Sequence, residues 1–175
     1  MGSMHINETI EAVAGLHSSP SPSPSPSPSP SNTRAAPSRG GERLEDRQFQ
    51  QMLDAYARTG GLVSGDEAAR RLRRYCDQPL STLARLIVAR SIVSFEWRSQ
   101  LLVPLFQFEP ADMSLRSSVV EVMREFTSVL DDWECACWFS QPNVWLHNEV
   151  PVDLIAKEPM RVLAAARTDR FIARG

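Results

Sequence analysis

The sequence predicts a mainly α-helical protein with one small β-hairpin, and three observations lead to this fold class. Apolar residues recur at three- and four-residue steps over most of the chain after residue 42, which is the period of amphipathic helices. Residues 92–97 and 101–108 are instead rich in β-branched and aromatic side chains, and the three residues between them favour a hairpin. No glycine lies between Ser114 and the last residue, so three or four helices can follow the hairpin.

The first 42 residues are expected to form a disordered, Ser-Pro-rich tail. They contain no aromatic residue and seven of the 13 prolines, and residues 19–31 alternate serine with proline. Such a composition cannot bury apolar surface and favours an extended polyproline conformation. Subtracting these 42 from the 175 residues leaves about 133 for a core, which suits one medium domain or two small ones.

Ordered elements are predicted from residue 43 onward. A first amphipathic helix is closed by the pair Gly60-Gly61. A second helix begins after Ser64, which can form a reciprocal capping box with Glu67, and runs to about residue 75. Ser81 is expected to cap a third helix that ends at about residue 90, and the hairpin follows it.

Four further helices are expected over residues 114–129, 131–140, 151–157 and 159–170. Pro151 and Pro159 open the last two, because the first turn of a helix needs no amide proton from its own residues. The acidic residues at 131, 132 and 134 complement the dipole at the start of the second of these helices. Together these helices are predicted to form a C-terminal bundle.

Charge is unevenly divided along the ordered part of the chain. Residues 43–98 contain 10 arginines and 7 acidic residues, a net charge of +3, whereas residues 99–175 contain 7 basic and 11 acidic residues, a net charge of −4. The whole chain has a formal net charge of only −2. A basic half joined to an acidic half suggests that the two halves meet different partners.

The pattern GGLVSGDEAARRL, then STLARLIVARSIV, then a hairpin ending in LVPLFQF resembles the winged helix-turn-helix modules of the excisionase and MerR type. The resemblance covers residues 60–108 and implies a winged helix-turn-helix domain at 43–110 that binds operator DNA. It implies that the second helix of the motif enters the major groove and that the hairpin approaches the backbone. Base edges would then be contacted by Ser81, Thr82 and Arg85, and phosphates would be neutralised by Arg90 and Arg98. The alternative is that the arginines form a solvated face of a short amphipathic helix.

The stretch WFSQPNVWLHNEVPVDLIAKEPMRVLAAARTDRFIARG resembles the toxin-binding domain of the Xre/MbcA/ParS family of bacterial antitoxins. The match covers roughly residues 115–175. The family pattern falls on Trp138, Phe139, Pro142, Asn143, Leu146, Pro151, Leu154, Val162, Leu163 and Gly175. Without the family, the same residues predict a corner that packs two helices, in which Pro142 forces a turn and Asn143 bonds its own backbone.

This second resemblance implies that residues 111–175 form a helical domain that binds a toxin. Family members with this pattern typically pair with RES-domain toxins, which consume NAD, and the family favours a homodimer. The toxin-binding residues implied are Trp138, Pro142, Asn143, Trp145, Leu146, Arg167, Arg170, Phe171, Arg174 and Gly175. The alternative for the terminal arginines is that they complement the helix C-terminal dipole and stay solvated.

No combination of residues predicts an enzyme, a cofactor or a metal site. Two of the three histidines lie in the tail, and His147 has no ligand spacing around it. The three cysteines, Cys76, Cys135 and Cys137, are an odd number at spacings that fit neither a disulfide framework nor a metal knuckle, so buried reduced thiols are expected. No apolar stretch approaches the length of a membrane span and no signal layout opens the chain, so a cytoplasmic location without membrane contact is expected.

The leading hypothesis from sequence is therefore a bacterial antitoxin of a type II toxin–antitoxin system. It would neutralise a RES-type toxin through its C-terminal half and autoregulate its operon by binding DNA through its N-terminal half. The alternative is a stand-alone DNA-binding transcriptional regulator or scaffold without a toxin partner.

Overall fold

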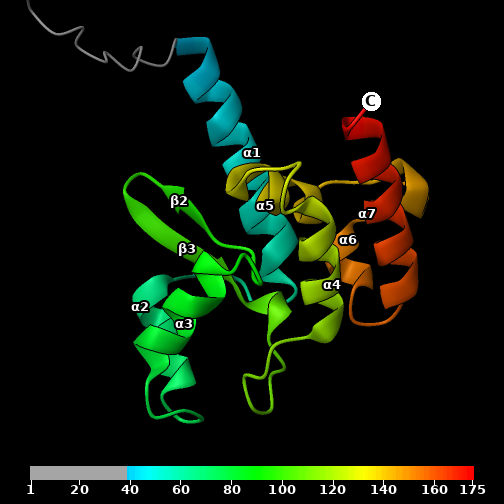
Figure 1. Cartoon of the computed structure of the whole chain (residues 1–175). Helices are drawn as coiled ribbons and strands as arrows, with labels where there is room; N and C mark the ends of the chain where they lie inside the picture. Colours follow the sequence, from blue (N-terminus) through cyan, green and yellow to red (C-terminus); the bar gives the residue numbers. More distant parts are fainter. Residues whose placement is uncertain (1–38) are drawn as a thin grey trace, which may run out of the picture. The chain divides into compact units, whose positions relative to one another are not determined.

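The computed structural model describes residues 39–175, which all belong to one compact unit (Figure 1). The predicted tail lies outside the described residues as far as residue 38. The first helix, α1 (Arg39–Ala57), begins four residues earlier than the predicted start of order at 43. The chain leaves it through Gly60 and Gly61, whose φ angles of 107° and 84° suit glycine, as the sequence predicted.

The N-terminal half consists of α1 and the six short elements that follow it. They are β1 (Leu62–Ser64), α2 (Gly65–Leu72), α3 (Pro79–Val88), β2 (Phe95–Trp97), β3 (Gln100–Pro104) and the 3₁₀ turn η1 (Leu105–Gln107). The three strands form an antiparallel sheet in the order β1-β3-β2. The prediction of a hairpin is confirmed, with shorter strands than expected, but strand β1 was not predicted.

The predicted start of α2 after Ser64 is confirmed with an incomplete capping box, whereas the predicted start of α3 is wrong. Ser64 does cap α2, since its Oγ accepts a hydrogen bond from the backbone N–H of Glu67 at 3.2 Å. The reciprocal half of that capping box is missing because the Glu67 carboxylate pairs with arginines of α2 instead. Ser81 does not cap α3, which begins two residues earlier at Pro79 after the N-cap Gln78.

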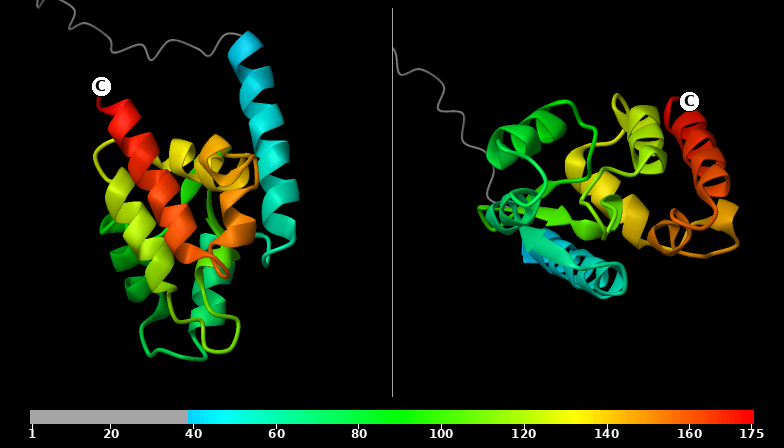
Figure 2. Two further views of the ribbon diagram at one scale, coloured as in Figure 1. Left: turned by 90° about the vertical axis from the view of Figure 1, so that its right-hand side faces the viewer. Right: turned by 90° about the horizontal axis from the view of Figure 1, so that it is seen from below.

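The C-terminal half contains the four predicted helices. They are α4 (Ser117–Phe126), α5 (Asp132–Ser140), α6 (Pro151–Leu154) and α7 (Pro159–Ala173), with a 3₁₀ turn η2 (Val144–Leu146) between α5 and α6. Pro151 and Pro159 occupy the first turns of α6 and α7, as predicted. Helices α4 and α7 lie side by side, and α5 lies between them and the sheet (Figures 1 and 2).

The fold is thus mainly helical with a small three-stranded antiparallel sheet, and its main core is shared by both halves. Met52 and Tyr56 of α1 and Phe106 of η1 belong to the same buried cluster as Phe126 of α4 and Phe139 of α5. A smaller cluster lies between α2, α3 and β3. None of the helices described between residues 39 and 175 is long and apolar enough to span a membrane.

Candidate functional site

Helix α3 presents a surface with one cation and several apolar side chains. Ser81 and Arg85 are exposed and Thr82 is half-buried, so the three residues predicted to face base edges lie on one short helix that is accessible from outside. Leu80 and Val88 are exposed beside them, and Val88 has 85% of its surface accessible. This face offers few polar groups for reading bases and has an apolar character of its own.

Arg98 lies in the two-residue turn between β2 and β3. Its backbone φ is +48°, and that of Ser99 is +62°, so both residues adopt the left-handed conformation that tight hairpin turns require. The Arg98 side chain is exposed, donates from Nη2 to Asp46 Oδ1 at 3.0 Å and lies over the ring of Trp97. A phosphate contact by Arg98 would therefore compete with one exposed ion pair, which is a weak competitor.

Arg90 follows α3 and connects it to the turn between α4 and α5. Its guanidinium donates to the carbonyl oxygens of Thr127 at 2.9 Å and Leu130 at 2.8 Å, and it pairs with Asp132 at 3.1 Å. These bonds fix α3 against the C-terminal half. The predicted phosphate contact of Arg90 would have to replace them.

The strongest polar cluster in the C-terminal half surrounds Asp169 of α7, a residue that the sequence did not single out. Its Oδ2 accepts hydrogen bonds from Trp138 Nε1 at 2.8 Å and from Asn143 Nδ2 at 2.7 Å. Its Oδ1 accepts one from Trp145 Nε1 at 2.7 Å. One carboxylate therefore joins α5, the corner after it and α7, and it brings together three of the predicted toxin-binding residues.

The corner itself has one buried and one outward side. Asn143 Oδ1 accepts from the backbone N–H of Trp145 at 2.9 Å, which is the local turn bond that the sequence predicted. Leu146 is fully buried, Pro142 is exposed, and Trp145 keeps 48% of its surface accessible. Leu146 is consequently a core residue. The Trp145 ring is fixed by its hydrogen bond to Asp169, and one side of the ring remains accessible to solvent.

The predicted arginines at the C-terminal end turn back onto α4. Arg167 donates to Glu125 at 3.0 Å, Arg170 pairs with the second oxygen of the same carboxylate, and Arg174 donates to Ser128 Oγ at 2.7 Å. Phe171 and Ile172 of the same turn point outward and are 78% and 58% exposed, and Gly175 is exposed at the end. The free surface of this end therefore combines exposed apolar side chains with arginines that are bonded to α4 and to the residues just after it.

Among the described residues, no group of three or more histidine, cysteine, aspartate or glutamate side chains could hold a metal ion. Cys135 and Cys137 are buried free thiols, and burial raises their pKa values to about 12 and about 11. Such thiols are protonated at neutral pH and are poor nucleophiles.

Comparisons with known proteins found no match to this chain. No model of a known protein family matches the chain, and searches of curated proteins and of solved structures found no significant match either.

Proposed function

We propose that the protein is an antitoxin that binds a partner protein through the C-terminal end of α7 and the adjacent corner. The observation that carries this proposal is an exposed apolar surface formed by Val144, Trp145, Phe171 and Ile172, which we call the apolar end. Ile172 lies three residues after Asp169 on the same side of α7, and Trp145 is bonded to Asp169, so Ile172 and Trp145 adjoin. Phe171 is exposed on the same helical turn as Ile172 but faces another side of α7.

The chemistry of the apolar end suits a protein partner. Large apolar and aromatic side chains that stay exposed to water are typical of protein contact sites, where their burial supplies most of the binding energy. Trp145 is held in place by its bond to Asp169, so it loses little freedom when a partner covers it. The sequence resemblance to antitoxins assigns the partner to the RES class of NAD-consuming toxins.

The test uses a RES-type toxin, with affinity measured by biolayer interferometry, and a gene for such a toxin beside this one would supply the probe. We expect Phe171→Ser combined with Ile172→Ser to weaken binding at least tenfold, and deletion of residues 170–175 to abolish protection of toxin-expressing cells. Met160→Ser is the matched control, because Met160 is equally exposed at the opposite end of α7. If the deleted protein binds and protects as well as the parent, the contact lies elsewhere and this assignment is wrong.

Binding of operator DNA by residues 43–110 is a second part of the proposal. It is supported by the element order helix, strand, helix, helix and hairpin, and by an accessible α3. We expect Arg85→Ala to reduce sequence preference for the protein's own upstream region and Arg98→Ala to reduce mainly the salt-dependent affinity. Gel-shift titrations at two salt concentrations test this, with exposed Arg124→Ala on α4 as the control. Unchanged affinity in both variants would count against DNA binding by α3 and the hairpin.

These two experiments also separate the antitoxin from the alternative of a stand-alone regulator or scaffold. DNA binding without any affinity for a RES-type toxin would favour the stand-alone regulator. Toxin binding without DNA binding would instead favour an antitoxin that does not regulate its own operon.

A further inference from the structure

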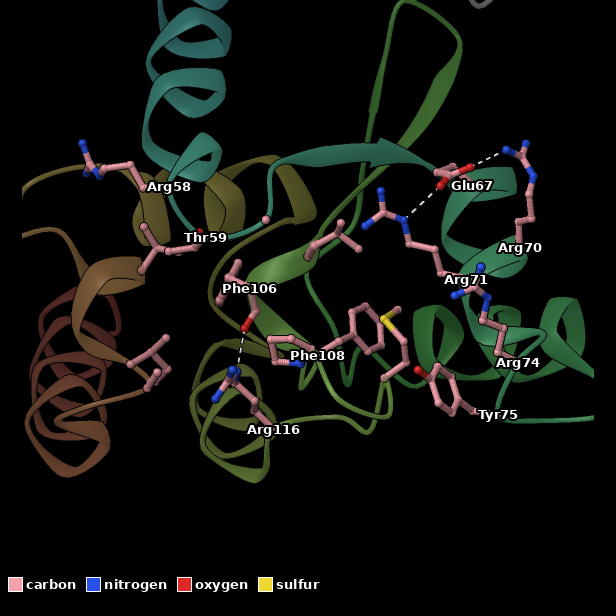
Figure 3. Close-up of a pocket in the computed structure, with 17 residues that line it drawn as sticks. Arg58, Thr59, Glu67, Arg70, Arg71, Arg74, Tyr75, Phe106, Phe108 and Arg116 are labelled. Atoms are coloured by element: carbon pink, nitrogen blue, oxygen red, sulfur yellow. Dashed lines mark hydrogen bonds and ion pairs between the residues drawn. The ribbon is translucent and has the colours of Figure 1, made fainter.

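A cavity of about 770 Å³ opens between α2, the segment from η1 to the start of α4, and α6 (Figure 3). This volume falls in the range typical of small-molecule sites. Its walls come from both halves of the chain, with Arg71 and Arg74 on one side and Val152 and Ile155 on the other. Neither DNA binding by α3 nor partner binding by the apolar end uses this space.

One wall of the cavity has a positive charge excess. Arg70, Arg71 and Arg74 line it together with a single acid, Glu67. The hydrogen bond from Arg71 lowers the pKa of Glu67, so this carboxylate is ionised at neutral pH and offsets only one of the three cations. The two remaining lining arginines, Arg58 and Arg116, pair with Asp153 and Glu109 at 2.6 and 2.8 Å. The α2 wall therefore has a net charge of +2.

The floor of the cavity is apolar and partly aromatic. Phe106 and Phe108 line it from η1 and the residue after it but are only 4% and 3% exposed, and Met113 adds its thioether. The aromatic ring that is open to a ligand is that of Tyr75, with 49% of its surface accessible. Figure 3 shows Tyr75 at the edge of this floor, next to Arg74. The Tyr75 hydroxyl donates to the carbonyl oxygen of Ala111 at 3.0 Å, which fixes the ring as part of the wall.

A cationic wall beside an aromatic floor recognises one class of molecule particularly well. A planar apolar ring gains from contact with the tyrosine ring and with guanidinium faces, and an anionic group attached to it accepts hydrogen bonds from the paired N–H groups of arginine. We propose that this cavity binds an aromatic anion, that is, a planar ring bearing a phosphate or carboxylate group. This inference is independent of the proposed antitoxin function.

Isothermal titration calorimetry on the full chain tests the proposal with three probes. ADP carries a ring and phosphates, naphthalene-1-carboxylate carries a ring and a carboxylate, and inorganic phosphate carries no ring. We expect at least one of the two aromatic probes to bind at least tenfold more tightly than inorganic phosphate. Which of the two binds more tightly identifies the anionic group that the arginines prefer.

Two matched charge reversals on one segment locate the site. Arg74→Glu should weaken binding of the preferred aromatic probe at least tenfold, because it reverses a charge in the α2 wall. Arg73→Glu makes the same change at the next position, which lines a different and smaller cavity with Asp66 and Gln78, and should change the affinity less than threefold. Ala156→Trp, which fills the cavity from the α6 side, should also abolish binding without any change of charge.

Thermal melts of each variant separate loss of binding from loss of fold, and Ala156→Trp provides a second route if Arg74→Glu is unstable. The proposal is overturned if neither aromatic probe binds more tightly than inorganic phosphate. It is also overturned if Arg73→Glu and Arg74→Glu weaken binding equally, since that would indicate unspecific attraction to a basic surface. Loss of DNA affinity in Arg74→Glu without binding of any probe would assign these arginines to nucleic-acid phosphates instead.

Discussion

At the residue scale, the Asp169 carboxylate accepts hydrogen bonds from three side chains of the C-terminal half. Three donors from Trp138, Asn143 and Trp145 converge on its two oxygens within 2.8 Å. Hydrogen bonds to an ionised acceptor are about twice as strong as those between neutral groups. Asp169 therefore orients both the buried side of the corner and the tryptophan that faces outward.

We expect Asp169→Asn to lower the free energy of unfolding by about 1–3 kcal/mol, because the new amide group would face a donor where the carboxylate accepted a bond. Urea denaturation of the two proteins measures this difference. Asp153→Asn is the control, since Asp153 pairs with the exposed Arg58 and such pairs contribute about 0–1 kcal/mol. Equal losses in the two variants would mean that the Asp169 cluster adds no more than a surface ion pair.

The buried thiols give a second prediction at this scale. Because burial raises the pKa values of Cys135 and Cys137 to about 12 and about 11, almost no thiolate exists at pH 8. Iodoacetamide at pH 8 should label the half-buried Cys76 first and leave the other two unmodified until urea is added. Mass spectrometry of the native and denatured protein reads this out. Rapid native labelling of Cys135 would contradict its buried position.

At the element scale, the β2–β3 hairpin depends on a turn that its sequence suits poorly. Arg98 and Ser99 both have positive φ angles, a conformation that asparagine and glycine adopt more readily. The hairpin is nevertheless held on both sides, since Trp97 stacks on Phe49 of α1 and on Trp133 of α5. Aromatic packing against two helices thus compensates for an unfavourable turn.

Replacing the second turn residue tests this explanation. Ser99→Gly should raise the free energy of unfolding by about 0.5–1 kcal/mol, because it removes the strain of a side chain at positive φ. Ser81→Gly on exposed α3 should instead lower it by about 0.5–1 kcal/mol, since glycine is a poor helix former. Urea denaturation measures both changes. A destabilising Ser99→Gly would show that the turn carries no strain.

At the scale of the whole molecule, the two halves share contacts that a boundary at residue 110 would cut. The Tyr56 hydroxyl of α1 donates to the carbonyl oxygen of Ala136 at 2.7 Å. The Phe106 ring lies 5.5 Å from that of Tyr56 and 4.9 Å from that of Phe139, measured between centroids. Each half by itself would leave side chains of this shared core exposed to water.

We therefore expect residues 39–175 to unfold in a single transition and the separate pieces 39–110 and 111–175 to remain largely unfolded. Each piece would expose the core surface that the other half covers in the intact protein. Circular dichroism and urea titration of the three proteins provide the measurement. A cooperative transition in the isolated 43–110 segment would support two independent domains, as the sequence predicted.

The sequence by itself determined the features that depend on neighbouring residues. Apolar periodicity and turn signals predicted α1 to α7, with starts that differ by two to four residues for α1, α3 and α4, and the two prolines at 151 and 159 marked where α6 and α7 begin. The Gly60-Gly61 pair ended α1 for the same local reason. Helix periodicity and turn chemistry act over a few residues, so they can be read directly from the order of side chains.

Only the tertiary structure decided which distant groups meet. Strand β1 has three residues, and it is a strand because β3 pairs with it, some forty positions later. Asp169 accepts hydrogen bonds from two tryptophans, and Arg90 links α3 to the turn between α4 and α5. These hydrogen bonds join residues that are 24 to 40 positions apart in the sequence. The α2 arginines line a cavity because α6 and the segment after η1 close its other sides. Each of these roles depends on three-dimensional proximity, which local propensity and spacing along the chain do not encode.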